Sequence, residues 1–365
     1  MFTVCAIICV FNEIDVIREC VEKLIVNEVD VYVLDNGSTD GSMSAIEDLL
    51  GHGLIAITPV EFLEDGQKVF NLSYLMRCKE QIAKSLNYDW YINVDSDEIR
   101  YSPWHDINLR AALEKVDQLG YTLVNFKLFN FRMIQDTTRT TSIEDELKFY
   151  SLPGFHDINQ VRAWKSHPAI ELASTGGHIT SRPDSRVFPI RFILKHYPIR
   201  SIAHGIRKLT TERKARFSPT ERRKGWHIQY DDIDENAISN LIWNKADLTE
   251  FDFEKERRSL LAEGAEVMAT VISNTSSQLI REHYDQCILD KFNRAGFTPQ
   301  HNQALMGIAH NLLQMAAQKS LPPLAVGERD AEFLQYATRA LAAESYLRGQ
   351  LNAYAALENI SYKID

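Results

Sequence analysis

The sequence predicts an α/β fold with a mostly parallel, Rossmann-like central sheet and an all-helical C-terminal region. In the first 100 residues, short apolar runs alternate with segments whose apolar residues recur at helical spacing. Continuously apolar strands that alternate with helices are typical of a parallel sheet covered on both faces. From about residue 234 onward, apolar residues recur every three or four positions, which indicates helices.

The first half of the chain supplies four of the expected strands. They are predicted within residues 2–11 and at 31–34, 54–57 and 90–94. The helices between them are predicted from apolar stripes that begin at Ile17, Ala45 and Leu72. Because the carboxyl ends of parallel strands meet at one edge of a sheet, the polar residues after these strands should converge there.

The later elements are less regular. A helix is expected at 109–119, a long strand at 121–131, and short strands at 160–164 and 191–195 within a mixed region from 142 to 200. Helical stripes then cover 251–273, 278–292, 302–317 and 328–357, with a break at Pro322 and Pro323. We therefore expect a first domain at 1–233 and a helical region at 234–365.

Composition excludes several classes of protein. The 365 residues carry a net charge of −10, which argues against a general nucleic-acid binder. Five cysteines without a CxxC pair disfavour a disulfide framework or a zinc site and fit a reducing cytoplasm. The apolar start lacks a basic segment and a cleavage site, and no apolar run reaches the roughly 20 residues of a membrane helix. Any membrane contact should be peripheral.

Two carboxylates follow the fourth strand of this series. Asp95 and Asp97 lie two positions apart at its end. Hard divalent cations take oxygen ligands and often bridge the phosphates of a substrate. The pair therefore predicts a site for a divalent metal ion that binds the phosphates of a nucleotide diphosphate.

Four motifs in order resemble a family 2-type glycosyltransferase. They are VFNE at 10–13, VLDNGSTD at 33–40, WYINVDSDE at 90–98, and LKHYPIRS at 194–201 with Lys208 after it. The resemblance covers about the first 210 residues. It implies a GT-A fold with a nucleotide-binding half at about 1–100 and an acceptor half at about 101–233. It further implies a sugar transfer with inversion in glycan or polysaccharide biosynthesis.

The resemblance also implies the metal ligands. Asp97, the last acid of the DxD motif, would bind Mn²⁺ or Mg²⁺, and Asp95 would contact the ribose or a metal-bound water. His196 would complete the metal shell, with His178 as the competing candidate. A metal at the diphosphate stabilises the charge that develops as the sugar–phosphate bond breaks.

Donor contacts are implied at Asn12, Glu13, Asp35, Asn36 and Lys208. Asn36 stands where the family often has a second aspartate. An amide can donate or accept a hydrogen bond, so the base is left open. The alternative for Asn12 and Glu13 is a helix cap.

The general base that inversion requires is not fixed by a short motif. Glu171 is the first choice, with Asp157 and Asp184 as alternatives. The basic stretch at 206–224 is either a solvated helix face or a loop that closes over the diphosphate.

The expected partners are a nucleotide-diphosphate sugar donor and a glycan or lipid-linked glycan acceptor, without nucleic acid. The protein would be cytoplasmic, with contact to the inner face of the membrane and homo-oligomerisation through the C-terminal helices as further options. Two rival hypotheses are a nucleotidyltransferase and a non-catalytic sugar-nucleotide-binding protein. The first is disfavoured because the loop after the first strand is acidic and lacks glycine.

Overall fold

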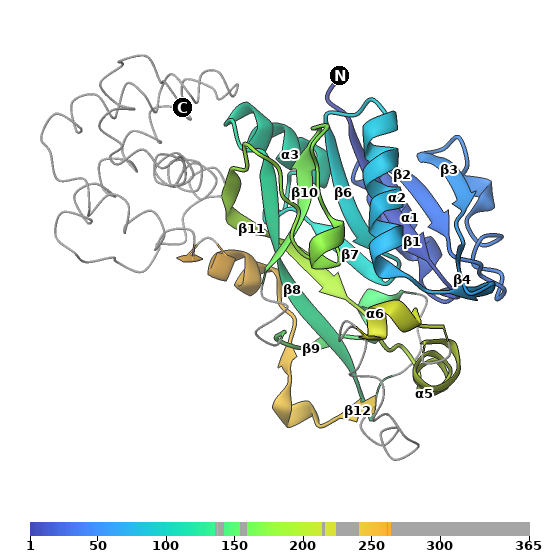
Figure 1. Cartoon of the computed structure of the whole chain (residues 1–365). Coiled ribbons are helices and arrows are strands. Elements are labelled where there is room, and N and C mark those ends of the chain that lie inside the picture. The colour runs from blue at the N-terminus through green and yellow to red at the C-terminus, as the bar shows by residue number, and fades with distance from the viewer. Residues whose placement is uncertain are drawn as a thin grey trace, which may run out of the picture.

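A mixed sheet forms the centre of the molecule in the computed structural model (Figure 1). Its main path runs β13-β9-β8-β10-β6-β1-β2-β3, while β11 and β12 pair with β8, and β7 pairs with β11. The structure describes residues 1–135, 137, 142–153, 159–213, 216–223, 241–260 and 262–263.

The N-terminal part of the sheet is parallel, as predicted. Strand β1 (Val4–Val10) lies between β2 (Asp30–Asp35) and β6 (Trp90–Asp95), and β3 (Leu54–Pro59) follows β2. These strands are apolar along their length because both faces of this part of the sheet are covered by helices.

The later part of the sheet is mixed. Strand β10 (Gln160–Lys165) is antiparallel to both β6 and β8 (Leu123–Ile134). Strand β11 (Val187–His196) is parallel to β8 and antiparallel to β7 (Glu98–Tyr101). The expected mostly parallel arrangement therefore describes the first half of the chain, and the sheet as a whole is mixed.

Short strands complete the two sheets. A separate hairpin pairs β4 with β5, β9 extends the sheet beside β8, and β12 and β13 add two-residue strands from the end of the described chain. Their bounds are Phe62–Glu64, Gln67–Val69, Phe149–Ser151, Ile242–Trp243 and Thr249–Glu250.

Helices cover both faces of the parallel strands. Helices α1 (Ile17–Val26) and α3 (Leu109–Gln118) bury their apolar stripes in one core, together with every second residue of β1. Helix α2 (Leu72–Ser85) packs in a second core on the other face, against the remaining residues of β1. The stripes predicted for all three helices are confirmed, because alternate strand residues need an apolar partner on each side.

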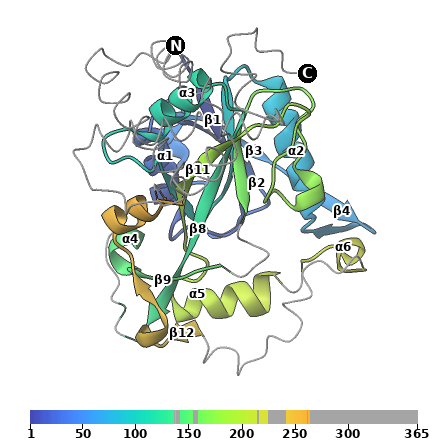
Figure 2. The ribbon, with the colours of Figure 1, turned by 90° about the vertical axis from the view of Figure 1, so that its left-hand side faces the viewer.

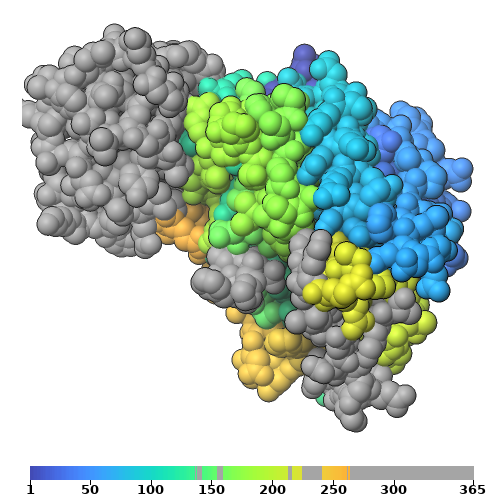
Figure 3. All heavy atoms as spheres, in the orientation of Figure 1, coloured from blue at the N-terminus to red at the C-terminus, as the bar shows by residue number. Residues whose placement is uncertain are grey.

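The outer side of α2 contacts later parts of the chain (Figure 3). Glu80 accepts hydrogen bonds from the backbone N–H groups of Leu172 and Ala173. At the start of α2, Glu221 accepts hydrogen bonds from the N–H groups of Leu72 and Ser73. A carboxylate is favourable at a helix N-terminus, so α2 is fixed at this end by the basic stretch.

That basic stretch folds into three short helical pieces beneath the carboxyl ends of the parallel strands (Figure 2). They are α5 (Ile202–Ile206), a π-helical segment (Arg207–Arg213) and α6 (Pro219–Arg223). Short α4 (Ile143–Glu146) lies near α1, where Ser142 donates to Glu19. The π-helical piece is notable because such irregular turns are frequent at functional sites.

The predicted C-terminal helices lie mostly outside the described residues. Residues 253–260 are helical, as expected for the first of them, and Phe251 packs against the core. The boundary at 233 and the role of the region from 264 onward remain predictions. Among the described residues, no helix combines the length and hydropathy that a membrane crossing requires.

Candidate functional site

The strand-end motifs do converge. The register places Val10 beside Asp35 and Cys9 beside Asp95, so the residues that follow β1, β2 and β6 share one edge of the sheet. Asn12 and Asp97 are both buried at this edge. The parallel topology therefore gathers acids and amides that are up to 85 positions apart in the sequence.

Asp97 is almost fully buried, with 4% of its surface exposed. Its Oδ2 accepts a hydrogen bond from Nζ of Lys208 at 2.9 Å, and its Oδ1 lies 3.6 Å from Nε2 of His196. Burial alone would raise the pKa of Asp97, but Lys208 and His196 hold that pKa well below its usual range. Asp97 is therefore an ionised carboxylate, ready to bind a cation.

His196 is oriented by a second partner. The last residue of β11, it forms a 2.8 Å hydrogen bond between Nδ1 and Oδ1 of Asn130 on β8. With Nδ1 directed at this amide oxygen, Nε2 is the ring nitrogen that faces Asp97. A histidine that binds a metal commonly donates its other N–H in this way. The neighbouring strands β8 and β11 thus hold Nε2 of His196 toward Asp97.

Asp95 lies at the more open side of the site, with 45% of its side chain exposed. Its Oδ2 accepts a hydrogen bond from Arg162 at 2.8 Å, and Arg162 also donates to buried Glu98. Burial of the site raises the pKa of Asp95, but Arg162 and Lys79 keep it well below its usual range. Asp95 is thus ionised too, and Arg162 ties it to the start of β7.

His178 belongs to the surroundings of Arg162. Its Nδ1 lies 3.1 Å from Nη2 of Arg162 and 3.3 Å from the amide of Gln160. Just before it, the carbonyl of Gly177 accepts a hydrogen bond from Asn93. Gly177 has φ +82°, and a Cβ there would lie 2.5 Å from that amide, so glycine is needed for this approach. His178 therefore lies on the Arg162 side, while His196 faces Asp97.

Asn12 and Glu13 do not cap α1. The helix starts after Val16, which forms no side-chain cap. Asn12 has φ +53°, its Oδ1 accepts from the N–H of Thr39, and its Nδ2 donates to Glu212. A non-glycine residue in this conformation is uncommon and is often found at functional sites.

Glu13 is the centre of a buried ion network. It accepts hydrogen bonds from Lys208 at 2.9 Å and from Arg200, which also binds both oxygens of Asp15. Burial raises the pKa of Asp15, yet its bonds to Arg200 lower it to about 2. Burial next to Arg200 and Lys208 lowers the pKa of His204 to about 3, so this histidine is neutral.

Glu13, Asp15 and His204 also have the spacing of a metal site, since their ligand atoms lie within 4.8 Å of one another. The guanidinium of Arg200, however, contacts all three, with its Nη2 only 3.0 Å from Nε2 of His204. A cation already neutralises this cluster. At Asp97, by contrast, Lys208 contacts only Oδ2, and Oδ1 faces Nε2 of His196, so this pair is the better candidate for a divalent ion.

The second strand end supplies Asp35 and Asn36. Asp35 accepts from the N–H of Ser38, which fixes the turn. Asn36 donates from Nδ2 to the carbonyl of Val60, so its Oδ1 faces away and accepts from Arg216 at 2.8 Å. The guanidinium of Arg216 also lies over the ring of Phe11, 3.3 Å from its centroid. Asn36 is thus held as an acceptor, like the aspartate that it replaces.

Of the three predicted general bases, Glu171 and Asp184 form contacts outside this cluster. The carboxylate of Glu171 accepts from the N–H and the hydroxyl of Ser174. Asp184 is 56% exposed and pairs with Arg182, which binds the carbonyl of Lys165. Lys165 lies beside Trp90, at the opposite end of β6 from Asp95. Asp157 lies outside the described residues.

Several residues of the cluster were not predicted individually. Glu98 follows the DxD motif directly, and Arg200 lies within the fourth motif, so the motifs could have identified both residues. His204 and Asp15 gave no signal, because isolated polar residues next to a helix are common. The pairing of Arg162 with Asp95 depends on β10 running beside β6, which the sequence does not reveal.

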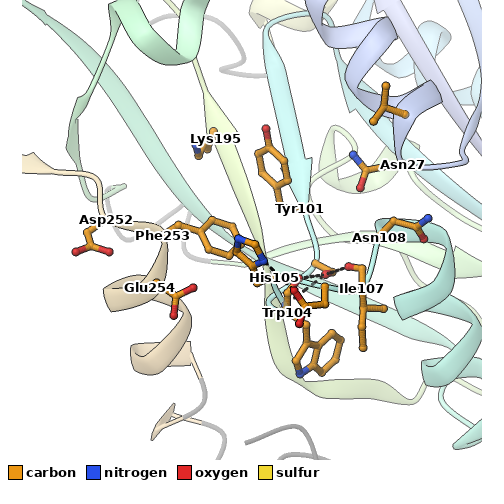
Figure 4. Close-up of a pocket in the computed structure, with 13 residues that line it drawn as sticks. Asn27, Tyr101, Trp104, His105, Ile107, Asn108, Lys195, Asp252, Phe253 and Glu254 are labelled. Atoms are coloured by element: carbon orange, nitrogen blue, oxygen red, sulfur yellow. Dashed lines mark hydrogen bonds and ion pairs between the residues drawn. The ribbon is translucent and has the colours of Figure 1, made fainter. Parts of the chain in front are cut away.

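A cavity of about 670 Å³ lies beside the neighbouring strands β7 and β11, which contribute Tyr101 and Lys195 to its lining (Figure 4). Lys195 lines it, whereas the next residue, His196, faces Asp97. Because successive strand residues point to opposite faces, the cavity and the cluster lie on opposite sides of the β7–β11 pair. Figure 4 shows His105 and Phe253 close together over Trp104. The cavity is therefore separate from the strand-end cluster.

Comparison with known proteins identifies the domain. Residues 5–170 match the model of the family described as glycosyl transferase family 2. No curated protein matches the sequence. Among solved structures, the chain is similar to crystal structures of S. aureus TarS. The fragment 1–349 is 12% identical, with 96% of this chain and 92% of that chain covered and a TM-score of 0.30.

The same fragment in complex with UDP is 14% identical, with the same coverages and a TM-score of 0.31. The longer TarS structure is 13% identical over 94% of this chain and 55% of that chain, with a TM-score of 0.30. The family match carries the assignment, and the observed sheet agrees with it. Residues 5–170 of this chain therefore match a glycosyl transferase family 2 domain, and this match, together with the observed sheet, supports a GT-A-like fold and glycosyltransferase activity.

Proposed function

We propose that the protein transfers a sugar from a nucleoside-diphosphate donor to a hydroxyl acceptor, with a divalent metal and with inversion. The acceptor would be a glycan, free or lipid-linked, in glycan or polysaccharide biosynthesis. The observation that carries this proposal is the placement of ionised Asp97 opposite Nε2 of His196, at the sheet edge where Asn12 and Asp35 also lie.

The residues present fit the proposed metal. A carboxylate oxygen and an imidazole nitrogen suit Mn²⁺, and Mg²⁺ would be bound mainly through oxygen. Cis ligands of an octahedral ion lie about 3 Å apart, close to the 3.6 Å between Oδ1 of Asp97 and Nε2 of His196. When bound, the ion would stabilise the charge of the departing diphosphate. Asp95, half-exposed beside it, would contact the ribose or a metal-bound water.

The base and ribose would lie between the ends of β1 and β2. Asp35 and Asn12 have side chains at this position, and Phe11 offers a ring face that Arg216 covers. Asn36 presents Oδ1 and not its amide N–H. This orientation supports a base that donates a hydrogen bond, because an acceptor on the protein requires a donor on the ligand.

The transfer itself is a single displacement. The acceptor oxygen attacks the anomeric carbon, the bond from that carbon to the phosphate oxygen breaks, and the nucleoside diphosphate leaves with the bonding electrons. The proton of the acceptor hydroxyl passes to a general base. The sequence favours Glu171 as this base, but in the structure the carboxylate of Glu171 is engaged by Ser174.

The test is turnover of a panel of UDP-, dTDP-, GDP- and CDP-sugars, with nucleoside diphosphate release as the readout. We expect release with Mn²⁺ or Mg²⁺ and its loss after chelation. Equal turnover in chelator would overturn the metal assignment. Retention of the anomeric configuration in the product, measured by NMR, would overturn inversion.

A further inference from the structure

The ammonium group of Lys208 contacts Asp97, the proposed metal ligand, and so already supplies a positive charge to this carboxylate. Its Nζ lies 2.9 Å from Oδ2 of Asp97 and 2.9 Å from Oε1 of Glu13. The residue is 4% exposed, so this ammonium is shielded from water. A buried carboxylate needs a partner of opposite charge, and in the free protein Lys208 is that partner.

A divalent ion on Asp97 would meet this ammonium at close range. Like charges repel strongly where water is excluded, because the effective dielectric constant is low. Lys208 and a metal ion therefore compete for Asp97. The nearby Arg200 adds further positive charge on the same side, through its contact with Glu13.

The segment that carries Lys208 is tied to the predicted donor site. Arg207 donates to the carbonyl of Asn12 and pairs with Glu212 at 3.1 Å, and Glu212 accepts from the Asn12 amide. Lys208 and Glu212 belong to the same π-helical piece. Asn12 is thus both a predicted donor contact and an anchor of the segment that positions Lys208.

We propose that Lys208 makes metal binding conditional on the donor. In the free protein the ammonium neutralises Asp97 and Glu13 and keeps a divalent ion away. The donor diphosphate, with its larger negative charge, draws the ammonium from Asp97 and opens that carboxylate to the metal. The idea rests on the proposed metal-dependent function. It differs from a fixed phosphate contact, because a lysine that only binds phosphate would not weaken metal binding in the absence of the donor.

The test compares Mn²⁺ affinity in the full chain without nucleotide, by electron paramagnetic resonance of free Mn²⁺. We expect Lys208→Met to bind Mn²⁺ at least tenfold more tightly than the wild type. Lys127→Met is the matched control, since Lys127 is also a shielded lysine paired with two glutamates, Glu256 and Glu263, away from the site. It should bind Mn²⁺ like the wild type.

A second arm repeats the titrations with UDP and with GDP. The gain in Mn²⁺ affinity on adding nucleotide should be at least tenfold smaller in Lys208→Met than in the wild type. Binding of Mn²⁺ to the nucleotide in solution is common to both proteins and cancels in this comparison. Glu212→Ala, which loosens the anchor but keeps the lysine, should bind Mn²⁺ alone with intermediate affinity, and it replaces Lys208→Met if that variant does not fold.

The outcomes separate this inference from the proposed function. Equal Mn²⁺ affinity in wild type, Lys208→Met and Glu212→Ala would overturn the role of Lys208 and leave metal dependence intact. No Mn²⁺ binding by any of these proteins, with or without nucleotide, would overturn the metal site itself and the inference with it.

Discussion

The two halves of the described chain contribute opposite charges to one site. The parallel half supplies the acids, among them Glu13, Asp95 and Asp97, at the ends of its strands. The later half supplies the cations, among them Arg162 and Lys208, from β10 and from the helical pieces beneath the sheet. Each half alone would leave buried charges without partners, which is costly. The ion pairs between the two halves therefore stabilise the site.

This division explains why the site residues of the first half can be predicted from the sequence more easily than those of the later half. The end of a buried parallel strand is a fixed place at the ligand-binding edge, so an acid there can be assigned a role from its position. A basic residue in the mixed part of the sheet cannot be placed in this way from its position in the sequence. The charge that it meets depends on which strands become neighbours across the sheet.

The largest expected effect comes from the acidic half. Asp97→Asn should lower turnover by about a thousandfold, because the neutral amide binds neither the proposed metal nor Lys208 as an ion pair. Turnover at saturating donor and Mn²⁺ is the measurement. Asp15→Asn is the control from the same half, since Asp15 pairs with Arg200 and not with the proposed metal. A similar loss in both variants would argue that the acids act only through the ion network.

Among the cations of the later half, Arg162 should have the largest effect on stability. Arg162→Met removes the buried guanidinium that Asp95 and Glu98 share, so we expect a loss of about 3 kcal/mol in the free energy of unfolding. Urea denaturation measures it. Arg18→Met is the matched control, since Arg18 is 44% exposed and pairs with surface acids, and it should cost under about 1 kcal/mol. Equal losses would show that burial of the pair is not the cause.

A smaller effect tests the contact that orients His196. Asn130→Ala removes the acceptor of its Nδ1–H, and we expect Mn²⁺ affinity, measured with nucleotide present, to fall between about 10-fold and 100-fold. Asn125→Ala, on the same strand but bonded to Gln160 and Asn159, is the control and should leave that affinity unchanged. If Asn130→Ala binds Mn²⁺ normally, His196 is not a ligand.

The sequence predicted the parallel half well and the site in part. Alternating apolar runs located β1, β2, β3 and β6, and their ends located Asn12, Asp35, Asp95 and Asp97. The mixed order of the later strands could not be predicted, because antiparallel neighbours need no helix between them and leave no regular pattern in the chain. For the same reason the pairing of Asp95 with Arg162 and that of Asp97 with Lys208 were missed, although Lys208 had been predicted as a donor contact.

The pH dependence of stability tests the ion network itself. His204 faces Glu13, Asp15, Arg200 and Lys208, and its pKa in the folded protein is about 3 against about 6.5 when unfolded. Between these values the unfolded chain binds one more proton, so stability should fall by about 1.4 kcal/mol for each pH unit below 6.5.

Urea denaturation between pH 7 and pH 5 measures this slope. His204→Asn should reduce the slope of unfolding free energy against pH by about 1.4 kcal/mol per pH unit, which is the contribution of this one histidine. His52→Asn, at an exposed position, should retain the wild-type slope. An unchanged slope in His204→Asn would mean that the histidine is not held neutral between the cations of the later half.

The smallest effect on stability concerns Glu171, the residue that the sequence favoured as general base. A general base contributes about 100-fold to 10,000-fold to the rate. If Glu171 were the general base, Glu171→Ala would therefore lower kcat by this factor. The structure instead engages its carboxylate with the N–H and hydroxyl of Ser174. We therefore expect a loss of about 1 kcal/mol in stability and an unchanged kcat.

Ser174→Ala is the informative companion variant. It removes the hydroxyl donor to Glu171 but leaves the carboxylate, so a purely local role predicts a small stability loss in both variants and normal kcat in both. If Glu171→Ala alone lowers kcat a hundredfold, the later half supplies a reacting acid as well as the cations. The division of charge between the two halves would then hold for the donor and metal contacts but not for the proton transfer.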